Sequence, residues 1–262
     1  MSAILMIHGV GSSAGAFTRL APAFRDRGWR VETPTLRPDL RTTETPPPEL
    51  AKVSLADYVA EVAQVARQLE EETGRPPVVL GHSMGGLLTQ KLAEAGLARG
   101  AILITPASPP DARAGRALAP VVTFANIIFS KEPQLRSHRI WRFGFNWGVL
   151  NRVPKARRAE LWNGNLYDSG RVYADLGWPD TDPNRTAYVD ETKIAVPMLV
   201  IGAARDRTVP VADVRLCAQK YAKAGAEYRE YPDNGHWIVD EPGTDAVIAD
   251  IFDWLDAKGL GE

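Results

Sequence analysis

Short runs of apolar residues alternate along this chain with segments that have helical spacing. Six runs are too short for helices and are expected to form β-strands, at residues 3–7, 29–33, 78–81, 101–105, 198–202 and 227–231. Helices are expected at residues 14–27, 54–73, 84–95, 211–224 and 244–257. Strands that are apolar on both faces must be covered on both sides, which favours a mostly parallel central sheet flanked by helices. The alternation therefore predicts an α/β fold.

The segment between residues 106 and 194 interrupts this alternation. It is too long for a loop, and it is rich in aromatic residues, Trp141, Phe145 and Trp147 among them. We expect a mostly helical insertion over residues 107–194, lying across the carboxyl ends of the strands. Residues 1–106 and 195–262 would then form the α/β core.

Composition narrows the classes of function. The net charge of -1 gives no field that would attract nucleic acid or an anionic membrane. The single cysteine, Cys217, permits neither an intrachain disulfide nor a cysteine-based metal cluster, and we expect it to be a buried structural thiol. No run reaches the ~18 apolar residues of a membrane span, and the start has no signal-peptide pattern. The expected compartment is the cytoplasm.

The sequence Gly-His-Ser-Met-Gly at residues 81–85 is the strongest chemical motif. It fits the pattern G-x-S-x-G and stands where a predicted strand gives way to a predicted helix. A nucleophilic hydroxyl projects from such a sharp turn, and the glycines let neighbouring backbone approach. Ser83 is therefore the candidate nucleophile. A glycine-serine turn without chemistry is the alternative, whereas a phosphate-binding loop would need a Lys-Ser or Lys-Thr pair that is missing here.

A serine nucleophile needs a base to take its proton. Of four histidines, His236 lies on a loop between the last predicted strand and the last helix, from which it can reach across the carboxyl edge of the sheet. We predict that His236 is the base. His8 lies in the first glycine turn, His82 is expected to be structural, and His138 is expected at the surface.

The base in turn needs a carboxylate that orients it. Asp206 closely follows the predicted strand at residues 198–202 and is our first choice. Asp111, shortly after the strand at residues 101–105, is the competitor. When a serine attacks a carbonyl carbon, the carbonyl oxygen becomes negatively charged, and this oxyanion requires two main-chain N–H donors. Met84 offers one and the turn at residues 8–11 the other, with the amide of Val10 the most plausible donor.

Four segments together carry a family resemblance: LMIHGVGSSAGAF, VVLGHSMGGLL, MLVIGAARDRTVP and DNGHW. With Ser83, Asp206 and His236 in this chain order, the sequence resembles the α/β-hydrolase fold family. The resemblance covers nearly the whole chain outside the insertion. It implies a catalytic site at the carboxyl edge of the sheet, and a lid or cap inserted after the sixth family strand.

The resemblance also implies a reaction. Ser83 would attack an ester carbonyl with His236 as base, and no metal or organic cofactor would be needed. Aromatic residues favour a small, hydrophobic ester, with Trp141, Phe145, Trp147 and Trp237 as candidate contacts, although rings of the insertion could instead pack only against one another.

Other functions on this fold remain open from the sequence. A carbon–carbon hydrolase, a haloperoxidase or a lyase would keep much of the scaffold, and a non-catalytic ligand-binding protein could keep the three residues. Ser83 argues against epoxide and haloalkane hydrolases, which use an aspartate nucleophile.

Overall fold

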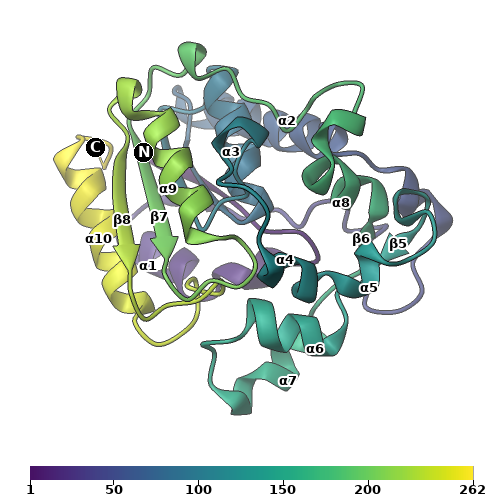
Figure 1. The fold of residues 1–262 in the computed structure, drawn as a ribbon. Coiled ribbons are helices and arrows are strands. Elements are labelled where there is room, and N and C mark those ends of the chain that lie inside the picture. Colours follow the sequence, from purple (N-terminus) through teal and green to yellow (C-terminus); the bar gives the residue numbers. More distant parts are fainter. Residues whose placement is uncertain (262) are drawn as a thin grey trace.

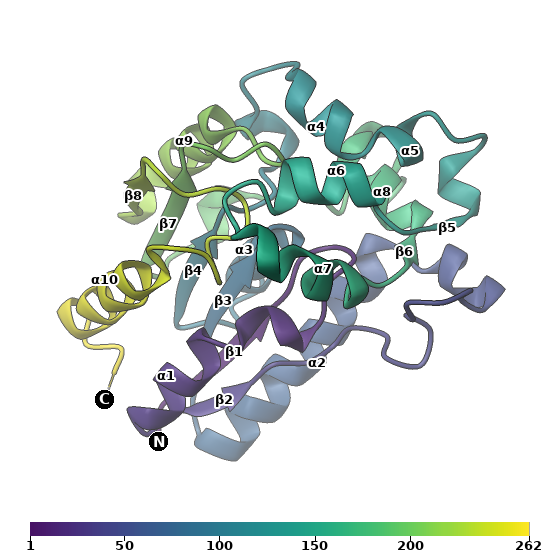
Figure 2. The ribbon, with the colours of Figure 1, turned by 90° about the horizontal axis from the view of Figure 1, so that it is seen from below.

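The central sheet has six parallel strands in the order β2-β1-β3-β4-β7-β8 (Figure 1 and, with every strand labelled, Figure 2). The computed structural model describes residues 1–261. The strands are β1 Ala3–Ile7, β2 Arg30–Glu32, β3 Val78–His82, β4 Gly100–Ile104, β7 Met198–Ala203 and β8 Glu227–Tyr231. Each lies within one residue of its predicted bounds.

Side chains of successive strand residues point to opposite faces of the sheet, and each face has its own core. In β1, Leu5 and Ile7 join one buried cluster, whereas Ile4 and Met6 join the other. Helices α2 (Leu55–Thr73), α3 (Met84–Glu94) and α9 (Val211–Lys220) cover the first face. Helices α1 (Leu20–Asp26) and α10 (Thr244–Ala257) cover the second (Figure 2).

The helix ends follow the sequence signals only in part. Ser54 caps α2 as predicted, since its Oγ accepts from the Asp57 amide while the Asp57 carboxylate accepts from the Ser54 amide. The single helix expected at residues 14–27 is instead a 3-10 turn, η1 Ala14–Phe17, followed by α1. The helix expected to end at residue 224 ends at Lys220 and continues as the 3-10 turn η8 Ala222–Ala224. Another 3-10 turn, η2 Pro48–Lys52, precedes α2.

The segment between β4 and β7 is built from short elements. Its helices are α4 Leu118–Thr123, α5 Ala125–Ile128, α6 Arg142–Gly144, α7 Lys155–Asn163 and α8 Gly170–Gly177, with a π-turn at η5 Phe145–Val149. Its 3-10 turns are η3 Pro110–Ala112, η4 Pro133–Leu135, η6 Pro179–Thr181 and η7 Glu191–Lys193. Two strands, β5 Ser137–His138 and β6 Asp168–Ser169, pair antiparallel, which the sequence did not predict.

This segment lies at the carboxyl ends of the strands. In Figure 1 the arrowheads of β7 and β8 point toward the side of the molecule that holds α6 and α7, and Figure 2 looks onto that side. The position matters because the chemistry of a parallel α/β sheet is built at this edge.

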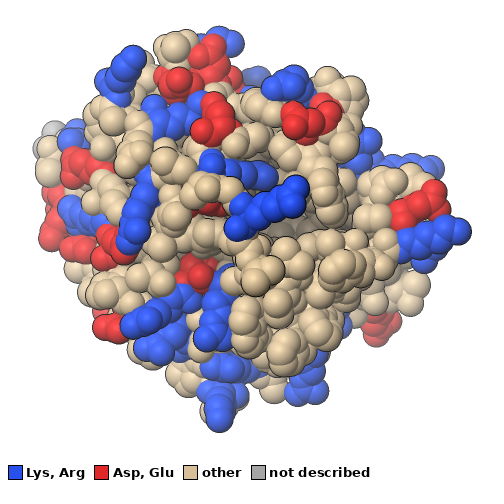
Figure 3. Space-filling view, viewed as in Figure 1, with Lys and Arg blue, Asp and Glu red and all other residues tan. Residues whose placement is uncertain are grey.

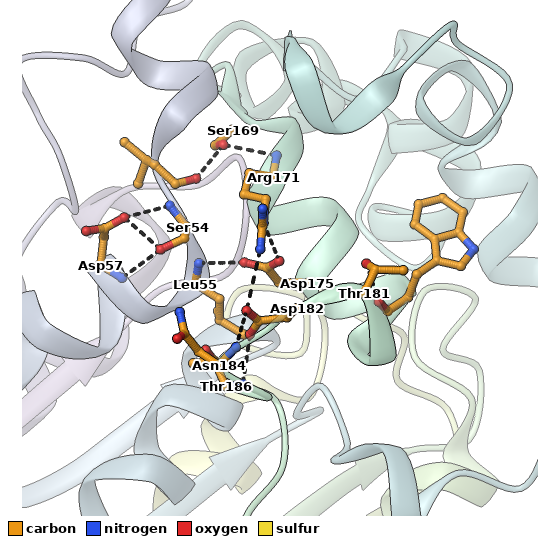
Figure 4. Close-up of polar contacts among 12 residues, drawn as sticks. Ser54, Leu55, Asp57, Ser169, Arg171, Asp175, Thr181, Asp182, Asn184 and Thr186 are labelled. Atoms are coloured by element: carbon orange, nitrogen blue, oxygen red, sulfur yellow. Dashed lines mark hydrogen bonds and ion pairs between the residues drawn. The ribbon is translucent and has the colours of Figure 1, made fainter.

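Helix α8 is tied to the start of α2 by buried polar contacts (Figure 4). The Asp175 carboxylate accepts from the Leu55 amide at 3.0 Å and from Nε of Arg171 at 2.7 Å. The Ser169 hydroxyl donates to the Val53 carbonyl at 2.6 Å. These bonds fix the second half of the segment on the core.

Cys217 is buried in α9, as predicted. Burial raises the pKa of its thiol to about 12, so the group stays protonated at neutral pH. No helix within residues 1–261 combines the length and the apolar character that a membrane crossing requires.

Candidate active site

Ser83 occupies a strained turn between β3 and α3. Its φ of 57° and ψ of -121° are rarely adopted by a residue with a side chain. The turn depends on close backbone contacts, because a Cβ on Gly85 would lie 1.9 Å from the carbonyl oxygen of Ile7. This is the geometry that the G-x-S-x-G pattern predicts, a serine presented at the start of a helix.

His236 and Asp206 are in direct contact. Nδ1 of His236 lies 2.7 Å from Oδ2 of Asp206, and both side chains are almost fully buried. The other oxygen of Asp206 accepts from the amides of Thr208 and Val209, at 2.7 and 2.9 Å. A carboxylate held in this way fixes the imidazole with its proton on Nδ1, which leaves Nε2 able to accept a proton.

Asp111, the competing carboxylate, lies elsewhere. Its side chain is half exposed and forms an ion pair with Lys220 at 2.6 Å. Of the two acids that the sequence offered, the structure brings only Asp206 to His236.

His82 holds His236 through the main chain. Nε2 of His82 donates to the His236 carbonyl at 2.8 Å, and the two ring centroids are 4.9 Å apart. Burial lowers the pKa of His82 to about 3, so its ring is neutral. His82 therefore has the structural role that was expected, and the part it holds is the loop that carries His236.

His8 is also buried and neutral. Its Nε2 accepts from the Leu36 amide at 3.1 Å, so its Nδ1 carries the proton and donates to the Gly9 carbonyl at 2.8 Å. Burial, then the positive charge of Arg41, lowers its pKa to about 3. The prediction that His138 lies at the surface is wrong: it is buried, and its Nε2 contacts the Pro133 carbonyl at 2.9 Å. Its ring packs edge-on against the ring of Tyr173, with the centroids 6.4 Å apart.

The loop after β1 runs directly against Ser83. A Cβ on Gly9 would lie 2.9 Å from Cβ and 3.3 Å from Oγ of Ser83, so only a glycine fits there without a shift. Val10 follows in this loop, and Met84 is the first residue of α3. Neither amide donates a hydrogen bond to another of the described residues 1–261. Both N–H groups are therefore available to a negatively charged oxygen.

A cavity of about 330 Å³ is lined by this loop and by His236. The core contributes its glycine loop at residues 9–11, together with His82, His236 and Trp237. The segment between β4 and β7 contributes a mostly apolar wall that comprises Phe124, Ile140, Phe145, Val149, Leu161, Glu160, Gly164 and Asn165. The cavity is thus bounded by both parts of the chain.

Four aromatic residues were expected to contact the substrate. Two of them, Phe145 and Trp237, line this cavity. Trp141 does not, because its ring lies on the outer surface beside Phe143, with 38% of the residue exposed. Figure 3 shows this uncharged face over α4 and α6. Trp147 also lies outside the lining, with the guanidinium of Arg207 stacked on its ring at 4.7 Å.

Glu241 is a site neighbour that sequence reasoning missed. Its Oε1 accepts from the Gly235 amide at 2.6 Å and from Nδ2 of Asn234 at 3.2 Å, which fixes the turn just before His236. Burial raises the pKa of this carboxyl. In the sequence, an acidic residue beside Pro and Gly looks like any solvated loop residue, so no local signal marked it.

Residues 1–261 contain no group of three or more His, Cys, Asp or Glu side chains placed to hold a metal ion.

Comparison with known proteins agrees with this architecture. Residues 4–249 match the family described as the alpha/beta hydrolase family. A monoacylglycerol lipase of Mycolicibacterium smegmatis is 25% identical over 263 residues, which cover 96% of this chain and 87% of that protein.

Solved structures share the fold at low identity. A pyrethroid hydrolase from Sphingobium faniae superimposes with a TM-score of 0.71 at 19% identity, covering 98% of each chain. A monoacylglycerol lipase of Paleococcus ferrophilus superimposes with a TM-score of 0.68 at 18% identity, covering 98% of this chain and 94% of the other.

Proposed function

Because this chain belongs to the alpha/beta hydrolase family, we propose that it hydrolyses carboxylic esters through an acyl enzyme formed on Ser83. The observation that carries the proposal is the contact of His236 with Asp206 at 2.7 Å, on a loop that is bonded to His82, the residue before Ser83 in its strained turn. The relatives support the bond type, since a monoacylglycerol lipase cleaves a carboxylic ester.

Acylation follows from the arrangement of these groups. Oγ of Ser83 attacks the ester carbonyl carbon while Nε2 of His236 takes the hydroxyl proton. Asp206 stabilises the imidazolium that forms. The amides of Val10 and Met84 donate to the oxyanion of the tetrahedral intermediate. As the carbon–oxygen bond to the alcohol breaks, His236 returns the proton to the leaving oxygen.

Deacylation repeats these steps with water. His236 takes a proton from a water molecule, whose oxygen attacks the acyl carbon, and the same two amides hold the second oxyanion. Collapse of this intermediate releases the acid, and the proton on His236 returns to Ser83. The scheme needs no metal and no organic cofactor.

We further propose that residues 107–194 act as a cap that shapes the substrate site. The apolar wall of the cavity supports this, because most of it comes from that segment. A cavity of about 330 Å³ is at the small end of ligand sites, which favours a small ester with a hydrophobic acyl or alcohol part.

A series of p-nitrophenyl esters of increasing chain length tests the proposal, with Ser83→Ala as the control. We expect turnover with one preferred chain length in the wild type, and no turnover above background in the variant. A near-zero response to every ester would contradict ester hydrolysis and favour lyase chemistry. Equal activity of Ser83→Ala would exclude Ser83 as nucleophile.

A further inference from the structure

The loop that carries Val10 is held by the segment between β4 and β7. Both main-chain groups of Gly11 are bonded to residues 165–168. Its carbonyl accepts from Nδ2 of Asn165 at 2.8 Å and from the Leu166 amide at 2.7 Å. Its amide donates to Oδ2 of Asp168 at 2.8 Å. The residue directly after the proposed oxyanion donor is therefore clamped from both sides.

Gly11 fits this clamp for two reasons. Its φ of 69° lies in the left-handed region, which favours glycine. A Cβ there would also lie 2.8 Å from Nδ2 of Asn165. The loop and residues 165–168 thus form one close-fitting contact.

Asp168 is the centre of the clamp. Its side chain has no exposed surface, and its two carboxylate oxygens accept from four donors. Oδ2 accepts from the Gly11 amide and pairs with Nη2 of Arg41 at 3.1 Å. Oδ1 accepts from the Tyr58 hydroxyl at 2.6 Å and from the Ser169 amide at 2.9 Å. These donors offset the cost of burying a carboxylate, and they hold it rigidly in place.

Arg41 bonds to Ser12, the next residue of the loop. Its Nη2 donates to the Ser12 carbonyl at 2.6 Å, and its Nη1 donates to the Leu36 carbonyl at 3.3 Å. The guanidinium is fully buried and is matched by the charge of Asp168. Arg41 and Asp168 thus fix the loop at Ser12 and at Gly11.

The clamped loop is also the one that touches Ser83. Gly9 lies against the serine, Val10 comes next and lines the cavity, and the clamped pair Gly11 and Ser12 follows. A shift of about 1 Å in a group that stabilises a transition state can cost on the order of 100-fold in rate. The bonds to Gly11 and Ser12 are therefore in a position to set the aim of the Val10 amide.

We propose that Asp168, paired with Arg41, is a positioning residue for the oxyanion site, supplied by the inserted segment and acting through Gly11 on the amide of Val10. This inference rests on the proposed function. It means that the inserted segment serves the chemistry as well as the shape of the cavity, because a displacement of residues 165–168 would release the oxyanion loop.

The test replaces Asp168→Asn, which keeps the shape but puts an amide NH₂ in place of an oxygen that accepts from two of the four donors. We expect kcat for the best p-nitrophenyl ester to fall on the order of 100-fold, with little change in KM. The affinity for a trifluoromethyl ketone, whose serine adduct carries an oxyanion, should fall in proportion. The affinity for the matching uncharged ether, which forms no oxyanion, should stay within about twofold of wild type.

Asp175→Asn is the matched control. Asp175 is also a buried carboxylate of the inserted segment, paired with an arginine and bonded to a main-chain amide of the core (Figure 4). It makes no contact with the loop among the described residues. Its variant should keep kcat and ketone affinity. Equal losses in both variants would mean general weakening of the segment and would overturn the inference.

Arg41→Lys provides a second variant should Asp168→Asn fail to fold. Lysine keeps the charge, but its single nitrogen cannot replace both Nη2, which contacts Ser12 and Asp168, and Nη1, which donates to the Leu36 carbonyl. We therefore expect a loss of about 10-fold in kcat. An unchanged kcat in a folded Arg41→Lys protein, or in folded Asp168→Asn, would contradict the inference. So would an equal loss of ether binding.

Hydrogen exchange separates this inference from the proposed function. Amides of residues 9–12 should exchange faster in Asp168→Asn than in the wild type or in Asp175→Asn. A wild type without esterase activity but with this exchange difference would contradict the function and leave the clamp standing. An active wild type whose loop exchange is the same in all three proteins would contradict the clamp alone.

Discussion

Nε2 of His82 donates to the main-chain carbonyl of His236 at 2.8 Å. The residue before the proposed nucleophile thus holds the residue proposed as its base. Thr105, at the end of β4, adds a hydroxyl at 3.3 Å to the same carbonyl. Residues at the carboxyl ends of β3 and β4 therefore fix the backbone of the His236 loop, while Asp206 fixes the ring of His236.

Replacing His82→Leu removes this donor but keeps an apolar side chain of similar bulk. We expect kcat to fall on the order of 10-fold, because the loop that carries His236 gains freedom. His82→Gln, which retains an N–H donor, should recover most of the loss. Steady-state kinetics of the three proteins check this, and equal rates in His82→Leu and wild type would contradict the positioning role.

Replacing each of the two candidate acids, Asp206 and Asp111, should affect kcat very differently. Asp206→Asn should lower kcat by about 10³- to 10⁴-fold, since the amide neither fixes the Nδ1–H form of His236 nor stabilises its positive charge. Asp111→Asn should leave kcat within about twofold, because Asp111 pairs with Lys220 at the surface. Loss of turnover only in the Asp111 variant would reverse the assignment.

The two buried neutral histidines predict a fall in stability on acidification. The pKa values of His8 and His82 lie near 3 in the folded protein, against an ordinary 6.5. Between these pH values the unfolded chain binds a proton at each site and the folded chain does not. The free energy of unfolding should fall by about 1.4 kcal/mol per pH unit for each histidine below pH ~6.5.

Urea unfolding at several pH values between 7.5 and 4.5 measures this slope. A His8→Gln variant should show a shallower dependence, since one of the two titrating groups is gone. The same slope in His8→Gln and wild type would mean that His8 takes up its proton in the folded state.

The cavity wall predicts how substrate preference can be changed. Phe145 lines the cavity and is 4% exposed, so Phe145→Ala should enlarge the site and move the preferred ester toward longer chains. Trp147→Ala, a neighbour outside the lining, should leave the preference unchanged. The ester series measures both, and a shift in the Trp147 variant alone would place the substrate elsewhere.

Local patterns in the sequence predicted the sheet, the sharp turn at Ser83 and the pairing of His236 with Asp206. Apolar runs mark the strands because each is buried on both faces, and glycines mark the turn at Ser83 because backbone approaches there without room for a Cβ. Asp206 and His236 could be chosen because carboxyl ends of parallel strands meet at one edge.

Contacts between distant segments left no such pattern. Asp168 bonds to Gly11 across 157 residues, and nothing around it in the sequence distinguishes it from a surface aspartate. The same holds for Trp141 and Trp147, whose aromatic character fits either a substrate wall or an outer face. Only the packing of the segment between β4 and β7 decides between those places.

The most direct measurement is rapid acid quenching of the enzyme during turnover of its best p-nitrophenyl ester, followed by mass analysis of the intact chain and its peptides. We expect a burst of one p-nitrophenolate per enzyme and an acyl mass on the peptide that contains Ser83. Rapid turnover with neither a burst nor an acyl group on Ser83, in a protein whose Ser83→Ala variant is equally active, would contradict the proposed acyl enzyme.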